Sequence, residues 1–468
     1  MWAERVIRTS PMRRVVLPAV ITLLCWSVIF SSTYRYSFFW DDLHLIRPYS
    51  WEEIRSTFHG RHDPEKIEWP ALRPLTTLLF CFQGASFGEN VVFQRIFMTG
   101  LMGVLLAAIG LLLCELGLSL PAVTVVFALF ASSRVFASLL LWITLGSLIL
   151  CYISMILAAY FYLLWLKRER LVYFALTLGF TALTIFTREE AYTLPVVLPL
   201  LWIISSSRRT NWRRALAGAG GVLAILAIHF VLRKIFIPEA PPVRFSSEAI
   251  KDMLVSFKSA WLPGGLQMVG HGDRLIGLLW KGFLGALLLL FLRTSSNRAL
   301  AQVSGALMLG IILCAPALGQ PRTFGTAMPT LAFFTAISVA CMEVLHRIQL
   351  IPFGQRLWRT AILIFLMLGL ILGVAGGIRR SIYVAEALHE NSAMKVSLDG
   401  ESLFDLYGKS TIPSERRQAG LTRLAAFGIR SPEQLRQFQL DLQKNPGYRK
   451  NRKTKSALFL PKYDYQSF

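Results

Sequence analysis

The chain has 468 residues, of which 54% are hydrophobic and only 16% are charged, and its mean hydropathy is +0.52. Soluble globular proteins carry about 25% charged residues, so the deficit, concentrated in long apolar runs, excludes a soluble protein and indicates a membrane protein. The net charge of +22 does not indicate nucleic-acid binding, because many lysines and arginines flank the apolar runs, where they set topology and meet anionic lipid head groups.

The apolar runs predict about eleven transmembrane helices, and thus an all-α polytopic membrane protein. A spanning helix needs about 20 predominantly apolar residues. The first run, from Val15 to Phe30, follows a basic segment, but aromatic and charged residues come after it in place of a cleavage site, so we interpret it as a retained span. The predicted spans are 15–33, 91–113, 120–133, 138–166, 171–186, 191–205, 215–235, 275–292, 299–319, 326–344 and 360–378.

The distribution of basic residues predicts the orientation. With the N-terminus in the cytoplasm, most Lys and Arg residues of the short connections fall inside, whereas three short outer loops carry one each, namely Arg134, Arg188 and Arg322. We therefore expect a transmembrane domain over 1–380 with a first extracytoplasmic loop at 34–90, and a polar extracytoplasmic tail over 381–468. No cytoplasmic segment is long enough to fold as a nucleotide-binding domain.

Two adjacent carboxylates, Asp41 and Asp42, lie at the outer end of the first span, and His44 follows them. Adjacent acids in a low-dielectric setting can raise one pKa, which suits a general base, and carboxylates can also hold a divalent cation. The alternative is a structural role, since aspartate often caps a following helix. Taken alone, the pair leaves both interpretations open.

Three arginines and one glutamate occur on the same predicted side. Arg73 stands between two prolines, Arg188 and Glu189 separate the fifth and sixth spans, and Arg322 joins the ninth and tenth. Arginine suits bidentate binding of phosphate, although each could instead meet lipid head groups or serve a polar turn. Together with the carboxylates, they predict an acid–base site beside an anion site, to which a lipid-linked phosphate would fit.

The histidines and cysteines give weaker indications of a functional site. His59 and His62 have helical spacing but no evident third ligand, so surface histidines are expected. His229 lies inside an apolar span and is expected to be a satisfied core residue. The six cysteines form no CxxC pair and predict neither a disulfide framework nor a zinc site.

This pattern resembles the GT-C glycosyltransferase superfamily, and is most similar to transmembrane O-mannosyltransferases and their bacterial relatives. The resemblance covers about residues 15–345. It rests on Trp40-Asp41-Asp42, on Arg73-Pro74-Leu75, on Arg188-Glu189-Glu190-Ala191 and on Arg322. Two features depart from it: no Asp or Glu occurs from Leu116 to Arg168, where relatives have an acidic residue, and the tail shows no tetratricopeptide pattern.

The resemblance implies transfer of a sugar from a polyprenyl-phosphate carrier to a lipid, glycan or protein acceptor at the outer face, with inversion. Asp41 would be the general base, with Asp42 orienting it or a metal. Arg73, Arg188 and Arg322 would bind the carrier phosphate, with Glu189 and His44 in support. It also implies a bacterial cytoplasmic membrane; no cofactor is certain, although a divalent cation would fit, and no nucleic acid is expected.

Two other functions compete with this interpretation. A transporter or lipid flippase would need ionisable residues at mid-membrane depth and paired repeats, whereas the acidic residues avoid the predicted mid-depth and no repeat halves are evident. A non-catalytic scaffold would place its function in the tail.

Overall fold

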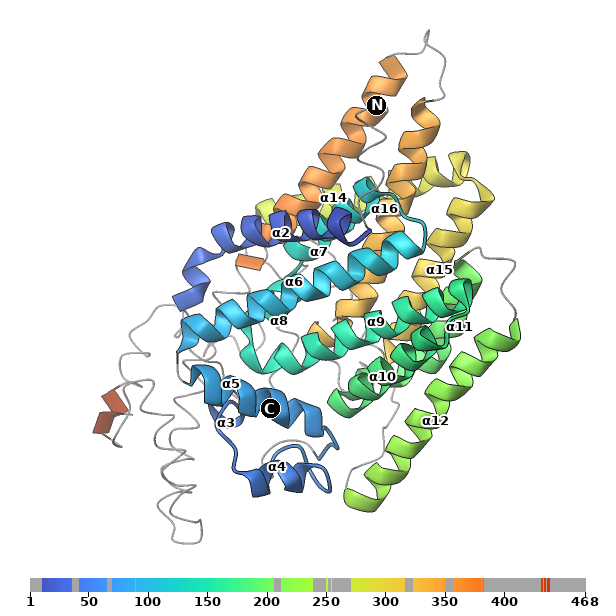
Figure 1. Ribbon diagram of the computed structural model, residues 1–468. Helices are drawn as coiled ribbons and strands as arrows, with labels where there is room; N and C mark the ends of the chain where they lie inside the picture. The colour runs from blue at the N-terminus through green and yellow to red at the C-terminus, as the bar shows by residue number, and fades with distance from the viewer. Residues whose placement is uncertain are drawn as a thin grey trace.

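The computed structural model covers all the predicted spans, at least in part. It describes residues 11–35, 42–64, 70–88, 90–205, 212–238, 271–315, 323–349, 357–379 and 381–382, with isolated positions at 250, 254, 431, 433, 434, 436 and 437. Regular structure in these ranges is entirely helical, without any strand (Figure 1). The predicted all-α class is therefore confirmed for this part of the chain.

The helices follow the predicted spans in order, except that the predicted span 138–166 is broken between 141 and 146, and further short helices lie within the described part of the predicted first loop. The elements are α2 (Pro11–Ile29), η1 (Ser31–Arg35), α3 (Asp42–Leu45), α4 (Trp51–Thr57), α5 (Pro74–Phe87), α6 (Val91–Glu115), α7 (Leu120–Ser132), α8 (Arg134–Leu141), η2 (Ile143–Leu145), α9 (Gly146–Arg168), α10 (Leu171–Thr187), η3 (Glu189–Thr193), α11 (Leu194–Ile204), α12 (Trp212–Phe236), α14 (His271–Thr294), α15 (Asn297–Leu313), η5 (Thr323–Thr326), α16 (Ala327–Gln349) and the helix Leu357–Arg379.

Within the described residues, six helices are long and apolar enough to cross a membrane. The helices α7 and α8, bent by 65° at their junction, together make a possible seventh span. Three more apolar segments are shorter, namely Val15–Ile29, Leu171–Thr187 and Asn297–Leu313. The chain is thus a multi-pass membrane protein by length and composition, whereas the predicted count of about eleven spans is not confirmed.

A serine pair causes the break between α7 and α8. Ser133 adopts an extended backbone (ψ 149°), which ends α7, and its Oγ accepts a hydrogen bond from the backbone N–H of Phe136 at 3.3 Å. This is a side-chain N-cap, so a new helix starts at once. At the same point, the Ser381 hydroxyl donates to the Ser132 carbonyl at 2.8 Å. The end of the helix Leu357–Arg379 is therefore fixed at the α7–α8 break.

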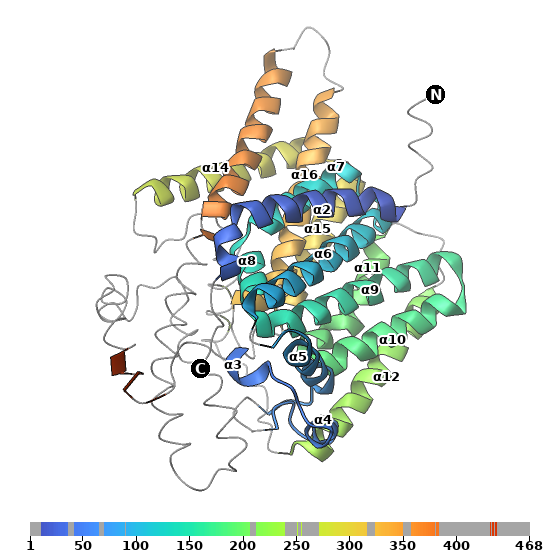
Figure 2. The same ribbon diagram turned by 60° about the vertical axis from the view of Figure 1, so that its left-hand side comes forward.

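A glycine seam packs the helix Leu357–Arg379 against α14. Its glycines recur every four residues, and a Cβ at Gly369 or Gly373 would overlap the rings of Phe283 and Trp280, respectively. Small residues let helices approach closely where no hydrophobic effect drives their association, as in a bilayer. Figures 1 and 2 show this helix in orange, projecting from the rest of the bundle.

Contacts between helix termini define two ends of the bundle. At one end, Lys167 of α9 pairs with Glu115 of α6 at 2.8 Å, and Arg214 of α12 pairs with Glu169. We call this the basic end, because its described residues include Lys167, Arg168, Arg170, Arg213, Arg214, Arg293, Arg298 and Arg347. At the other end, α2 and α10 finish, and α6 and α9 begin.

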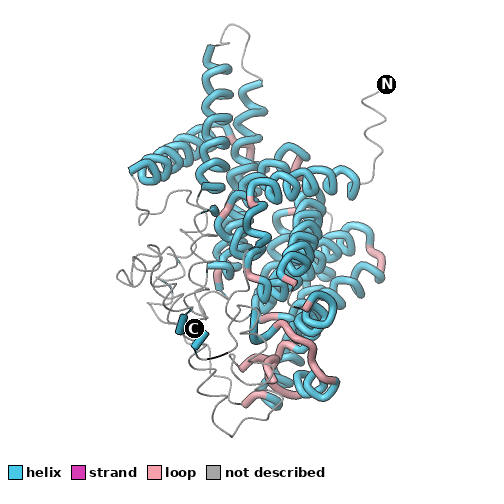
Figure 3. The backbone as a smooth tube through the Cα atoms, turned by 90° about the vertical axis from the view of Figure 1, so that its left-hand side faces the viewer, coloured by secondary structure: helices cyan, strands magenta, loops and turns pink. Residues whose placement is uncertain are grey.

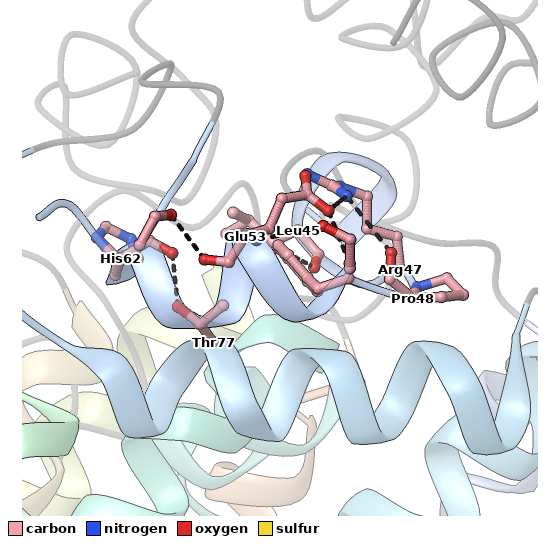
Figure 4. Close-up of polar contacts among 9 residues, drawn as sticks. Leu45, Arg47, Pro48, Glu53, His62 and Thr77 are labelled. Carbon is pink, nitrogen blue, oxygen red and sulfur yellow. Dashed lines mark hydrogen bonds and ion pairs between the residues drawn. The ribbon is translucent and has the colours of Figure 1, made fainter. Parts of the chain in front are cut away.

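The described part of the predicted first loop contains the helices α3, α4 and α5 and lies at that second end. Its helix α5 carries the α3–α4 segment on one face, where the backbone of Arg47 lies so close to Gly84 that no side chain would fit there. Arg47 also forms a two-pronged ion pair with Glu53, at 2.7 and 3.2 Å. Thr77 of α5 donates to the carbonyl of His62 at 2.6 Å (Figure 4). Much of the described loop structure gathers around this region (pink in Figure 3).

Candidate functional site

The loop before α5 meets the turn between α10 and α11 through one ion pair. Proline at the first position of α5 fixes the start of that helix, so Arg73 is the residue immediately before it. Its Nε and Nη2 contact Glu189 Oε2 at 2.6 and 2.5 Å. Both side chains are mostly enclosed, at 15% and 21% exposed. Arg73 and Glu189, which the sequence predicts to share a site, therefore touch directly.

The charge on Glu189 is held by its arginine neighbours. Burial raises the pKa of this carboxyl, but the positive charge and hydrogen bond of Arg73, with the charge of Arg188, outweigh burial and lower it to about 2. Glu189 is thus ionised at any physiological pH. Its carboxylate offsets one arginine charge at this end of the bundle.

Arg188 forms a second pair next to the first. Its Nε donates to Glu190 at 3.2 Å and its Nη1 to the Ser147 hydroxyl at 3.4 Å. Burial lowers the pKa of this guanidinium, but the charge and hydrogen bond of Glu190 outweigh it, so the net shift is upward. Two arginines and two glutamates thus form a cluster without net charge. The donors not used within the described residues are Nη1 of Arg73 and Nη2 of Arg188.

Backbone contacts support the same junction. The Thr76 hydroxyl of α5 donates to the carbonyl of Thr187, the last residue of α10, at 2.7 Å. Both threonines are buried. This hydrogen bond fixes the residue before Arg188 against the first turn after Arg73, so the two arginines are held by neighbouring backbone segments.

His229 of α12 forms hydrogen bonds with both segments that carry the Arg73–Glu189 pair. Its Nε2 lies 3.2 Å from the carbonyl oxygen of Leu72, and its Nδ1 lies 3.3 Å from the Tyr192 hydroxyl. A carbonyl only accepts, so Nε2 carries the proton, and Nδ1 of the neutral ring accepts from Tyr192. Leu72 precedes Arg73, and Tyr192 shares η3 with Glu189. The prediction of a satisfied core histidine is confirmed.

His62 is buried, so the prediction of a surface histidine is wrong. Its exposed fraction is 5%, and its Nδ1 has no hydrogen-bond partner among the residues that the structure describes. The chain folds back here, because the His62 N–H donates to the Ala71 carbonyl at 2.9 Å. Burial, together with the positive charge of Arg73, lowers the pKa of His62 to about 3, so the ring is neutral. Its neighbour Asp63 is buried as well.

Asp42 is buried at the start of α9. It is 1% exposed, and its Oδ1 accepts from the backbone N–H of Thr144 at 2.7 Å. Thr144 lies in η2, which leads directly into α9, so Asp42 caps a helix from another part of the chain. Arg95 of α6 donates to the Leu141 carbonyl, the last residue of α8, at 2.7 Å. Arg95 thus satisfies a backbone carbonyl at the end of α8, and Asp42 satisfies a backbone N–H at the start of η2.

A chain of hydrogen bonds links Asp42 to the arginine cluster. Thr144 donates its N–H to Asp42, its carbonyl accepts from the Ser147 hydroxyl at 3.0 Å, and Ser147 is the group that Arg188 approaches. The N-terminus of α9 therefore lies between the carboxylate and the arginines. The structure brings Asp42, Arg73, Arg188 and Glu189 to one end of the bundle, although they come from three distant segments.

Two of the predicted site residues, Asp41 and Arg322, lie outside the described residues, as does the side chain of His44. Within the described ranges, no three His, Cys, Asp or Glu side chains lie close enough together to hold a metal ion. The expected divalent cation therefore stays a prediction that depends on Asp41.

Sequence reasoning missed Arg95, which is fully buried, and Asp63. Arg95 had a usable signal, because an arginine inside an apolar span is costly and usually serves a purpose. Asp63 had none, since its burial depends on the packing of the first loop against α5.

Fold and site together define a multi-pass helical membrane protein with a cluster of partly buried acidic and basic side chains at one end of its bundle. No family model matches the chain, and a search of curated proteins found no similar one.

Proposed function

We propose that the chain is a membrane glycosyltransferase of the GT-C type, which moves a sugar from a polyprenyl-phosphate carrier to an acceptor at the extracytoplasmic face, with inversion. The proposal includes about eleven spans, a cytoplasmic N-terminus and a bacterial cytoplasmic membrane as the location. One observation carries it: Asp42, the neighbour of the proposed base, is linked through Thr144 and Ser147 to Arg188.

The arginine cluster supports an anion site with a particular mode of binding. Glu189 and Glu190 already compensate Arg73 and Arg188, so an incoming phosphate would use the donors left over, Nη1 of Arg73 and Nη2 of Arg188. Arginine presents several donors in a fixed fork, so one guanidinium can hold a carboxylate on one edge and a phosphate on another. The glutamates would then orient the arginines.

Asp41 and Asp42 take different roles in this proposal. Asp42 uses one oxygen to cap η2 and α9, so it is a structural anchor for the segment that carries its neighbour. Asp41 would remove the proton from the acceptor as the new bond forms, a step that contributes about 10²–10⁴ in rate. Arg322 would complete the phosphate site, with His44 in support.

The test is transfer by the purified full chain in nanodiscs, measured as release of polyprenyl phosphate from a polyprenyl-phosphate sugar in the presence of a membrane extract as acceptor source. We expect Asp41→Asn to lose at least about 10²-fold in rate. Arg73→Gln and Arg188→Gln should raise KM for the donor. Arg47→Gln is the matched control, because Arg47 pairs with Glu53 at a similar exposure (13% and 24%) on another part of the same loop.

Full activity of Asp41→Asn would refute the proposed base. If Arg47→Gln raised KM as much as Arg73→Gln, the anion site would be refuted. A chelator separates a shared metal from an orienting role for Asp42: loss of activity on chelation would assign the aspartates to a cation.

A further inference from the structure

An apolar cavity of about 110 Å³ lies between α6, α9, α11, α15 and α16. Only Gln302 and Thr335 contribute polar side chains to its wall, and the Thr335 hydroxyl is satisfied by the Leu331 carbonyl at 2.9 Å. A buried water needs two to four polar partners, so this space favours an apolar occupant. Its wall includes Leu112, Met155, Leu201, Ala306, Leu313 and Met328.

The cavity reaches the basic end of the bundle at the turn after α6. Leu116 and Leu118 line it, while Gly117 between them turns with φ +86°. A Cβ at Gly117 would lie 3.0 Å from Nη2 of Arg298, so the guanidinium sits directly over this turn. Gln302, one helical turn after Arg298, donates to the Leu116 carbonyl at 3.4 Å. An apolar space thus ends beneath an arginine.

The charge of Arg298 is uncompensated by the described part of the chain. Three other basic residues at this end have acidic partners: Lys167 pairs with Glu115, Arg214 with Glu169 and Arg347 with Glu343. Arg298 is exposed and makes no ion pair or hydrogen bond with a described residue. It can therefore meet an anion from outside the bundle.

We propose that the cavity and Arg298 bind one phospholipid with an anionic head group, whose acyl chain enters the cavity while its phosphate lies against Arg298. Alkyl chains are the apolar molecules that surround a membrane protein, and a basic residue at the membrane surface selects anionic head groups. This lipid site lies at the end of the bundle opposite the Arg73–Glu189 cluster, so it does not depend on the proposed transferase function.

The test is native mass spectrometry of the full chain released from nanodiscs of equal parts phosphatidylglycerol and phosphatidylcholine with the same acyl chains. The wild-type chain should retain phosphatidylglycerol in preference to phosphatidylcholine. Arg298→Gln should lower this preference about fivefold, the effect of one basic residue near a membrane surface. Arg293→Gln is the matched control, since Arg293 is also exposed at the basic end but belongs to α14, which contributes no residue to the cavity wall.

Two variants test the cavity itself. Ala306→Leu on α15 and Ala332→Leu on α16 each fill the space from a different helix, so one remains informative if the other misfolds. Thermal unfolding in phosphatidylcholine nanodiscs checks that each is folded, and retention of phosphatidylglycerol should fall in both. Unchanged retention in a folded cavity-filled variant would overturn the proposal, as would equal losses in Arg298→Gln and Arg293→Gln.

Discussion

Nε of Arg73 lies 2.6 Å from Oε2 of Glu189, a residue 116 positions further along the chain. The pair joins the first extracytoplasmic loop of the proposed topology to the turn between two apolar helices. It is therefore both a tertiary anchor for α5 and the centre of the candidate site, and the two roles call for separate measurements.

Removing one partner of this pair should destabilise the protein. Glu189→Gln leaves Arg73 enclosed without its counter-charge, and breaking a buried pair in this way costs about 3–5 kcal/mol, less here because both groups keep some solvent contact. A double-mutant cycle with Arg73→Gln, followed by thermal unfolding in detergent, should give a coupling of at least about 1 kcal/mol. If the loss of stability in the double variant equalled the sum of the losses in the two single variants, the pair would contribute no coupling energy.

Acid should destabilise the protein in two steps. His62 has a pKa of about 3 when folded and about 6.5 when unfolded, so the unfolded chain binds more protons between these values and stability falls as pH drops below 6.5. Glu189, with a folded pKa of about 2, adds stability that is present above pH 4.5 and is lost as pH falls towards 2.

His62→Leu tests the first step, because leucine is apolar and the unpartnered Nδ1 leaves no hydrogen bond to lose. The variant should unfold at the same or a higher temperature at pH 7, and its loss of stability between pH 6.5 and 4.5 should be smaller by up to about 2 kcal/mol. A curve parallel to that of the wild type would show that His62 is solvated.

Replacing Asp42 by asparagine should lower the stability of the protein less than replacing it by alanine. Asp42→Asn keeps an oxygen that can accept from Thr144, whereas Asp42→Ala removes the cap of η2 and should cost about 1–2 kcal/mol. Ser133→Ala, which removes the ordinary N-cap of α8, is the comparison. Thermal unfolding measures all three, and an Asp42→Asn loss as large as that of Asp42→Ala would assign the role to charge instead of the cap.

His229 should position Arg73 through its hydrogen bond to the backbone carbonyl of Leu72. His229→Phe keeps the ring that packs edge-on against Phe186 but removes both hydrogen bonds. We expect it to raise KM for the polyprenyl-phosphate donor several-fold with little change in kcat, and His229→Gln, which retains a donor and an acceptor, to restore part of the loss.

Tyr162→Phe is the control for this tether. Tyr162 is another buried tyrosine whose hydroxyl contacts α12, donating to the Ala215 carbonyl at 3.1 Å near the basic end. The Tyr162→Phe variant should leave KM for the polyprenyl-phosphate donor unchanged. Equal effects of Tyr162→Phe and His229→Phe on KM would show that the two hydrogen bonds of His229 act only on general stability.

The proposed topology places residue 460 and the 206–214 connection on opposite sides of the membrane. An alkaline phosphatase fusion at residue 460 should be active, and one within 206–214 inactive, because the proposed topology makes the first site extracytoplasmic and the second cytoplasmic. A fluorescent-protein fusion at each position should give the reverse pattern. The same result at both positions would rule out the eleven-span topology.

Much of the helical framework could be predicted from the sequence, since apolar runs report burial in hydrocarbon directly. The predicted spans 91–113 and 171–186, for example, are helices Val91–Glu115 and Leu171–Thr187. The helix α5 was missed because its 14 residues are too few for a span and lie in a segment with charged neighbours. The end of a span at Ser133 was predicted, but the break between α8 and α9 at 142–145 was missed, because it lies inside the apolar run of the predicted span 138–166.

The sequence by itself determined the class of protein, the order of its helices and the residue types available for chemistry, because hydrophobicity and charge act locally along the chain. The tertiary structure alone decided that Arg73 pairs with Glu189, that Asp42 caps α9 and that His62 is buried. Each of these depends on segments about 100 residues apart or on how a loop packs on a helix, and the resulting loss of water sets both the strength of the contacts and the direction of the pKa shifts.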